Sequence, residues 1–69
     1  MRKIIEEIVS KHKNNKIKYN EMIYQIDSAF IERKIDREIQ MNRIDDKMFI
    51  LSIVWKEKGQ ELTYKNVFQ

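Results

Sequence analysis

Few residues of this chain have side chains that could do acid-base or metal chemistry. The candidate carboxylates lie within one short stretch and are Asp27, Glu32, Asp36 and Glu38. On a helix, Glu32 and Asp36 would share one face because they are four residues apart. Arg33, Lys34 and Arg37 are interleaved with these carboxylates, and such a mixture is typical of a solvated helix surface. We therefore expect neither a catalytic site nor a metal site in this stretch.

The other groups that catalysis commonly uses are scarce. His12 is the only histidine and the chain has no cysteine, so zinc would lack the nitrogen and sulfur ligands that it favours. No nucleophile with a histidine base beside it is visible. Because Gly59 is the only glycine, a glycine-rich loop for phosphate groups is excluded. We expect a protein that is not an enzyme and has no cofactor, no metal and no small-molecule substrate.

Four lysines form a basic cluster early in the chain: Lys11, Lys13, Lys16 and Lys18. Residues 1–20 carry six cations and two anions, a net charge of +4, whereas residues 21–55 carry five cations and seven anions, a net charge of −2. Lysines near a turn can neutralise phosphates, and Tyr19 beside them could stack on a base. The same cluster would also suit a soluble rim around a turn. Nucleic-acid contact through the cluster is therefore an alternative function, as a small transcriptional regulator.

Long helices with few breaks are the expected elements, because the chain has no proline and one glycine. Residues 2–13 form the first helix, with one apolar stripe: Ile4, Ile5, Ile8 and Val9. Residues 20–42 form the second, whose stripe rotates along its length: Ile23, Ile26 and Phe30, then Ile31, Ile35 and Ile39. The rotation allows either one long helix or a break between Glu32 and Asp36. We favour one long helix.

Residues 45–58 are expected to form the third helix. Asp45 is placed to accept hydrogen bonds as its N-cap, and Gly59 follows the last turn, where the left-handed conformation often ends a helix. The expected fold is thus all-α, a small bundle of about three helices with a short C-terminal tail. The alternative is an α+β fold with a C-terminal β-hairpin over residues 48–68, because Ile50, Ile53 and Val54 are β-branched.

The third segment also predicts an interaction surface. If residues 48–55 are helical, apolar side chains lie on all its sides, and a helix of this kind must be buried on all sides. Two other helices cannot enclose it, and a chain of 69 residues has only a small core. We therefore expect a homodimer or a protein partner. The candidate interface residues are Met48, Ile50, Ile53, Val54 and Trp55.

A short motif within the expected second helix is Ile26-Asp27-Ser28-Ala29-Phe30, followed by Glu32-Arg33. It resembles the Ile-Asp-x-Ala-Leu opening of the IDEAL domain, a short helical module of Gram-positive bacteria, from which it departs at Phe30. The resemblance implies a helix and no enzymatic activity. By size and composition only, the chain also looks like small phage-encoded proteins that bind and inhibit one host factor.

The chain is expected to form a single domain, residues 1–69, in the cytoplasm. No apolar run approaches the roughly 18 residues of a membrane span, and Glu6 and Glu7 lie where a signal peptide would be apolar. The absence of cysteine fits a reducing compartment. The leading hypothesis is a bacterial or phage-encoded interaction module that binds a host protein stoichiometrically, as a regulator or inhibitor.

Overall fold

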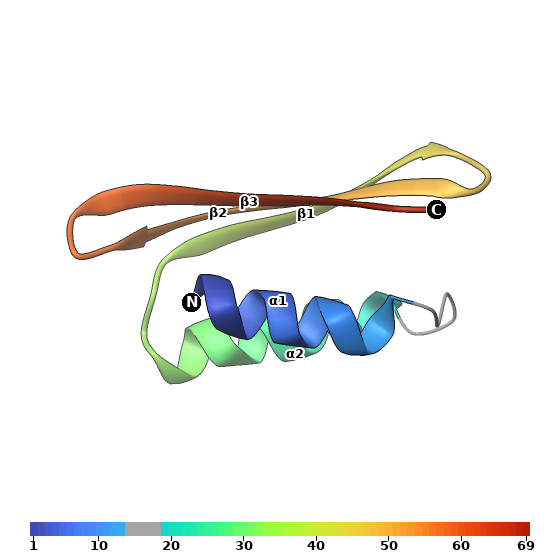
Figure 1. Ribbon diagram of the computed structural model, residues 1–69. Coiled ribbons are helices and arrows are strands. Elements are labelled where there is room, and N and C mark those ends of the chain that lie inside the picture. The colour runs from blue at the N-terminus through green and yellow to red at the C-terminus, as the bar shows by residue number, and fades with distance from the viewer. Residues whose placement is uncertain (14–18) are drawn as a thin grey trace. The chain divides into compact units, whose positions relative to one another are not determined.

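Two helices followed by three strands make up the fold, which the computed structural model describes for residues 1–13 and 19–69 (Figure 1). The elements are α1 (Arg2–His12), α2 (Tyr19–Glu32), β1 (Arg37–Asp45), β2 (Met48–Glu57) and β3 (Gln60–Phe68). The helices belong to one unit, Met1–Lys34, and the strands to another, Ile35–Gln69; we name them the helical unit and the sheet unit. The protein is therefore α+β. The expected all-α bundle is wrong, and the alternative with a C-terminal hairpin over residues 48–68 is confirmed.

The helical unit consists of α1 and α2 packed side by side (Figure 1). The first helix was expected over residues 2–13 and ends one residue earlier, at His12. Its buried residues, Ile5, Val9 and His12, are spaced by four and three, which places them on one face. The residues of α2 that are buried repeat in the same way: Met22, Ile26, Ala29 and Phe30.

The second helix is shorter than the expected 20–42, because α2 ends at Glu32. Arg33 and Lys34 donate backbone N–H bonds to carbonyls three residues earlier, at 3.1 and 3.0 Å, which tightens the last turn. Lys34 then adopts a left-handed conformation with φ 55°, and the helix cannot continue through it. The break between Glu32 and Asp36 that the rotating stripe allowed is the observed arrangement.

The sheet unit is a three-stranded antiparallel sheet with strand order β1-β2-β3. Along β2, the residues Leu51, Ile53 and Trp55 are buried, and those between them are half-buried. A strand places alternate residues on opposite faces, so a central strand can be apolar at every position. This is why the apolar run of residues 48–55, interrupted only by Ser52 and expected within a helix over residues 45–58, belongs to a strand.

The residues expected to cap that helix form the two turns of the sheet. Asp45 Oδ1 accepts a hydrogen bond of 2.8 Å from the N–H of Lys47, in the turn between β1 and β2. Lys58 and Gly59, with φ of 51° and 77°, connect β2 to β3. Two consecutive residues with positive φ form the type I′ turn that suits a two-residue hairpin loop. A side-chain acceptor and a left-handed residue serve helix ends and β-turns equally, so these signals cannot distinguish the two.

Replacing Gly59 with alanine should destabilise the protein by about 1–2 kcal/mol, because an alanine would have to hold a left-handed conformation. A Cβ at this position meets no atom within 4 Å, so the cost comes from the backbone and not from a clash. The free energy of unfolding in urea is the measurement. Lys58→Asn is the matched control and should leave stability unchanged or raise it, since asparagine tolerates positive φ. Equal stability of Gly59→Ala and the wild type would contradict the turn assignment.

Glu57 should make the stability of the protein depend on acid pH. The indole N–H of the buried Trp55 donates a hydrogen bond of 2.6 Å to Glu57 Oε1. This bond, with a smaller contribution from Lys58, holds the pKa of Glu57 below its ordinary value of 4.5. A lowered pKa in the folded state means stabilisation that is complete above pH 4.5 and is lost as pH falls through the folded pKa.

Urea unfolding at a series of pH values between neutral and about 3, followed by tryptophan fluorescence, measures this effect. The variant Glu57→Gln should lose less stability on acidification than the wild type, because its side chain does not titrate. The control Glu38→Gln removes an exposed carboxylate of the same sheet. If both variants respond to acid as the wild type does, the Trp55–Glu57 bond is not a source of the pH dependence.

Candidate functional site

The basic cluster lies where α1 ends and α2 begins. Lys11 is in the last turn of α1 and Lys13 directly follows the helix, and both side chains are exposed. Tyr19 is the first residue of α2 and is half-buried. Lys16 and Lys18 lie outside the described residues. The structure thus brings Lys11, Lys13 and Tyr19 to one end of the helical unit.

The net charge of the chain belongs to the helical unit. Residues 1–34 carry eight cations and five anions, which gives +3, whereas residues 35–69 carry six of each, which gives 0. Cations at the end of α1 compensate the negative pole of that helix, and the positive pole of α2 lies at the same end. Glu21, in the first turn of α2, is the nearest carboxylate in sequence to Tyr19. Among the described residues, Lys11 and Lys13 therefore give this end of the unit an excess of positive charge.

His12 positions the end of α1. Its ring is buried, and Nδ1 donates a hydrogen bond of 2.8 Å to the carbonyl oxygen of Ile8, one turn earlier. A carbonyl can only accept, so this bond assigns the proton to Nδ1. The imidazole closes the last turn between the two exposed lysines and does not belong to the exposed basic surface.

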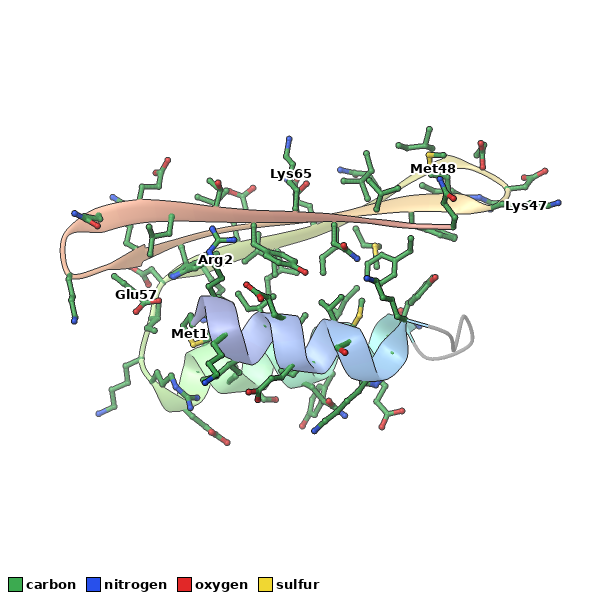
Figure 2. The ribbon with its side chains drawn as sticks, in the orientation of Figure 1. Met1, Arg2, Lys47, Met48, Glu57 and Lys65 are labelled. Atoms are coloured by element: carbon green, nitrogen blue, oxygen red, sulfur yellow. The ribbon has the colours of Figure 1, made fainter. Side chains whose placement is uncertain are left out.

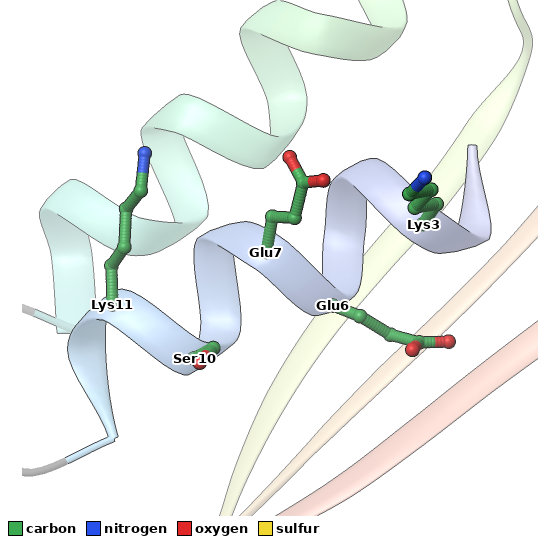
Figure 3. A pocket seen from close by; sticks show the side chains of 5 residues that line it. All are labelled: Lys3, Glu6, Glu7, Ser10 and Lys11. Atoms are coloured by element: carbon green, nitrogen blue, oxygen red, sulfur yellow. The ribbon is translucent and has the colours of Figure 1, made fainter.

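The exposed side of α1 lines an open pocket of about 590 Å³, formed by Lys3, Glu6, Glu7, Ser10 and Lys11 (Figure 3). Its two cations lie on either side of its two anions along the helix, so the charges of the pocket lining sum to zero. The residues that line the pocket include no histidine that could act as a base for Ser10. Within residues 1–13 and 19–69, no group of three or more histidine, aspartate or glutamate side chains could hold a metal ion.

The four candidate carboxylates do not form one group. Asp27 and Glu32 belong to the helical unit, and Asp36 and Glu38 belong to the sheet unit. Glu32 lies 3.8 Å from the guanidinium of Arg33, with both side chains largely exposed. Because α2 ends at Glu32, this residue and Asp36 do not share a helix face.

The candidate interface residues divide between the two faces of the sheet. Ile53 and Trp55 are buried, and Met48, Ile50 and Val54 are half-buried on the opposite face. The two sets cannot act as one surface, because alternate residues of a strand point in opposite directions. We name the face with Ile50 and Val54 the open face of the sheet.

The sequence did not predict the exposure of two apolar residues of α2. The side chains of Tyr24 and Ile31 are 73% and 55% exposed. They are seven residues apart, which is close to two helical turns, so they lie on one side of α2. That side is opposite the buried residues Met22, Ile26 and Ala29. A helical wheel over α2 alone would have separated Ile31 from the core stripe, whereas the expected longer helix included it.

Neither α1 nor α2, in the part of the chain that the structure describes, has the length and apolar character of a membrane span. Residues 26–33, which resemble the IDEAL domain, run along α2 to the residue after its end; the resemblance itself stays a prediction. Comparisons of the chain with protein-family models, with curated proteins and with solved structures found no match.

Proposed function

We propose that the protein is a small cytoplasmic regulator that binds nucleic acid through its phosphate backbone, with the basic end of the helical unit as the contact surface. The observation that supports this proposal is the segregation of charge: +3 on the helical unit and 0 on the sheet unit. Lys11 and Lys13 are exposed at that end, next to the positive pole of α2. Neutralising phosphates releases counterions, and this release is the main source of non-specific affinity for nucleic acid.

The chemistry of the cluster suits phosphates better than bases. Lysine carries a compact charge on a flexible stem, whereas reading guanine edges relies mainly on the planar fork of arginine. The chain has no arginine between Arg2 and Arg33. Tyr19, half-buried at the start of α2, is an aromatic residue beside the cluster, and aromatic rings can stack on unpaired bases. We therefore infer binding with little sequence preference.

The fold gives less support to a protein interface over residues 48–55. Such an interface was expected because a helix over these residues would be apolar on all sides, and the segment is instead a central strand with partners at both edges. Burial of Ile53 and Trp55 removes the largest side chains from the proposed surface. Nucleic-acid binding through the basic cluster does not require that helix, because the cluster begins at the end of α1, which has nearly the expected bounds.

The double variant Lys11→Gln/Lys13→Gln should weaken binding to a fluorescent generic DNA, measured by anisotropy at about 50 and 200 mM salt. The slope of log K against log salt should fall in magnitude by about 1.8 for duplex DNA, which is about 0.9 for each lost phosphate contact. Single-stranded DNA of the same length, tested in parallel, shows whether stacking contributes.

The matched control is Lys47→Gln/Lys58→Gln, which removes the same charge from two exposed residues of the sheet unit. It should bind like the wild type. An equal loss in the control would assign the affinity to net charge alone. A wild-type protein that binds neither DNA at the lower salt would overturn the proposal.

The exposed apolar side of α2 favours a second candidate function, the protein interaction module. Tyr24 and Ile31 expose large apolar surfaces on the same side of the helix. Tyrosine is one of the residue types enriched at the centres of protein interfaces. This side of α2 would then be the surface that contacts a protein partner.

The double variant Tyr24→Gln/Ile31→Gln should lose a protein partner that the wild type retains in a pull-down from a nuclease-treated lysate of the source cell. The variant should unfold within about 0.5 kcal/mol of the wild type, since both residues are exposed. The control bait Glu6→Gln/Glu7→Gln alters the exposed side of α1. A partner that both altered baits retain would exclude this side of α2 as its binding surface.

A further inference from the structure

The edge strand β3 is the most regular open feature of the sheet unit. In the strand order β1-β2-β3, both outer strands are edges. The pairing of β3 with β2 continues without interruption from Gln60 to Phe68. The pairing of β1, by contrast, is irregular between Arg43 and Asp45, and such bulges protect an edge against further strands. A long regular edge presents a row of backbone donors and acceptors to which another strand can bind.

The hairpin turn determines which residues of β3 face the outer edge. In a two-residue type I′ hairpin, the residues that flank the turn, Glu57 and Gln60, form a hydrogen-bonded pair. Bonded and non-bonded pairs then alternate along an antiparallel ladder. The backbone N–H and C=O groups of Glu61 and Lys65 therefore point toward the outer edge, and these residues have exposed side chains.

The side chains at this edge are complementary to a second copy of the same strand. If two copies of β3 pair antiparallel about a two-fold axis at Thr63, Glu61 of each copy lies opposite Lys65 of the other. Two opposite-charge pairs then form across the new ladder, on the open face of the sheet. Lys65 projects from β3 away from the sheet in Figure 2. The same register places Leu62 opposite Tyr64 on the other face.

Neighbouring registers lack this complementarity. Moving the axis by one residue to Tyr64 places Glu61 opposite Val67 and Lys65 opposite Thr63. Moving it to Lys65 places two lysines directly opposite each other, which is destabilising. The axis at Thr63 is therefore the register that pairs both charged residues of the edge.

We propose that two copies of this chain associate through β3, antiparallel about Thr63, so that their sheets form one continuous sheet of six strands. A two-fold pairing of this kind uses the same residues on both chains and closes after two copies. It does not depend on the proposed nucleic-acid binding, because its residues belong to the neutral sheet unit and not to the basic cluster.

Charge reversal at the edge tests this proposal by sedimentation velocity over a range of concentrations. Glu61→Lys alone places like charges opposite each other, and so does Lys65→Glu alone. Each should raise the dimer dissociation constant by about tenfold, since two pairs change from attraction to repulsion. The double variant Glu61→Lys/Lys65→Glu should dimerise like the wild type. An equimolar mixture of the two single variants should also recover dimers, because every lysine then faces a glutamate of the other chain.

Circular dichroism of each single variant verifies that it folds, and recovery in the mixture excludes misfolding as the cause of lost dimers. Hydrogen exchange by NMR identifies the surface: the amides of Glu61 and Lys65 should become protected as the concentration rises. A wild type that stays monomeric at the concentrations of the NMR experiment would overturn the proposal. A dimer in which these two amides still exchange rapidly would also overturn it, and would assign the interface to another surface.

Discussion

Strand β2 hydrogen-bonds to a neighbour on each side along nearly its whole length, and this double pairing organises the sheet unit. It satisfies the backbone of an apolar segment that could not remain exposed. It also aligns the residues of β1 and β3 in fixed cross-strand pairs, so the faces of the outer strands follow from the register of the central one. Leu51, Ile53 and Trp55, all buried, lie together on one face as a consequence, and the residues between them form the open face.

The same register relates the turns to the backbone groups that the outer strands present at the edges of the sheet. Lys58 and Gly59 hold positive φ and set Glu57 opposite Gln60. From that pair onward, alternation decides which backbone groups of β3 point outward. At the opposite end of the sheet, Arg43 donates to Asp46 Oδ1 at 2.8 Å and to the carbonyl oxygen of Asp45 at 3.2 Å, where the pairing of β1 is irregular. One edge is therefore interrupted and the other is regular.

The net charge is distributed unequally between the two units. The helical unit carries the net positive charge, with lysines at the end where α1 stops and α2 starts. The sheet unit is neutral, and its charges alternate in sign along the edge strand, as Glu61 and Lys65 show. A surface with an excess of one sign suits an anionic ligand, whereas a surface with balanced signs suits a copy of itself. The two proposals can hold together because they use different residues.

The sequence by itself determined the first helix and the position of the basic cluster, because a stripe with helical period and a run of lysines are local features. It also contained the hairpin over residues 48–68 as an alternative. It could not choose between that hairpin and a third helix, since Asp45 and Gly59 suit helix caps and β-turns equally. Nor could it exclude a helix to residue 42, because Ile31, Ile35 and Ile39 are four apart, a spacing that also fits one face of a strand. Tertiary structure decided both points: pairing of β2 with β1 and β3 makes strands of residues 37–45, 48–57 and 60–68, and the strand geometry places Ile53 and Trp55 on one face and Ile50 and Val54 on the other.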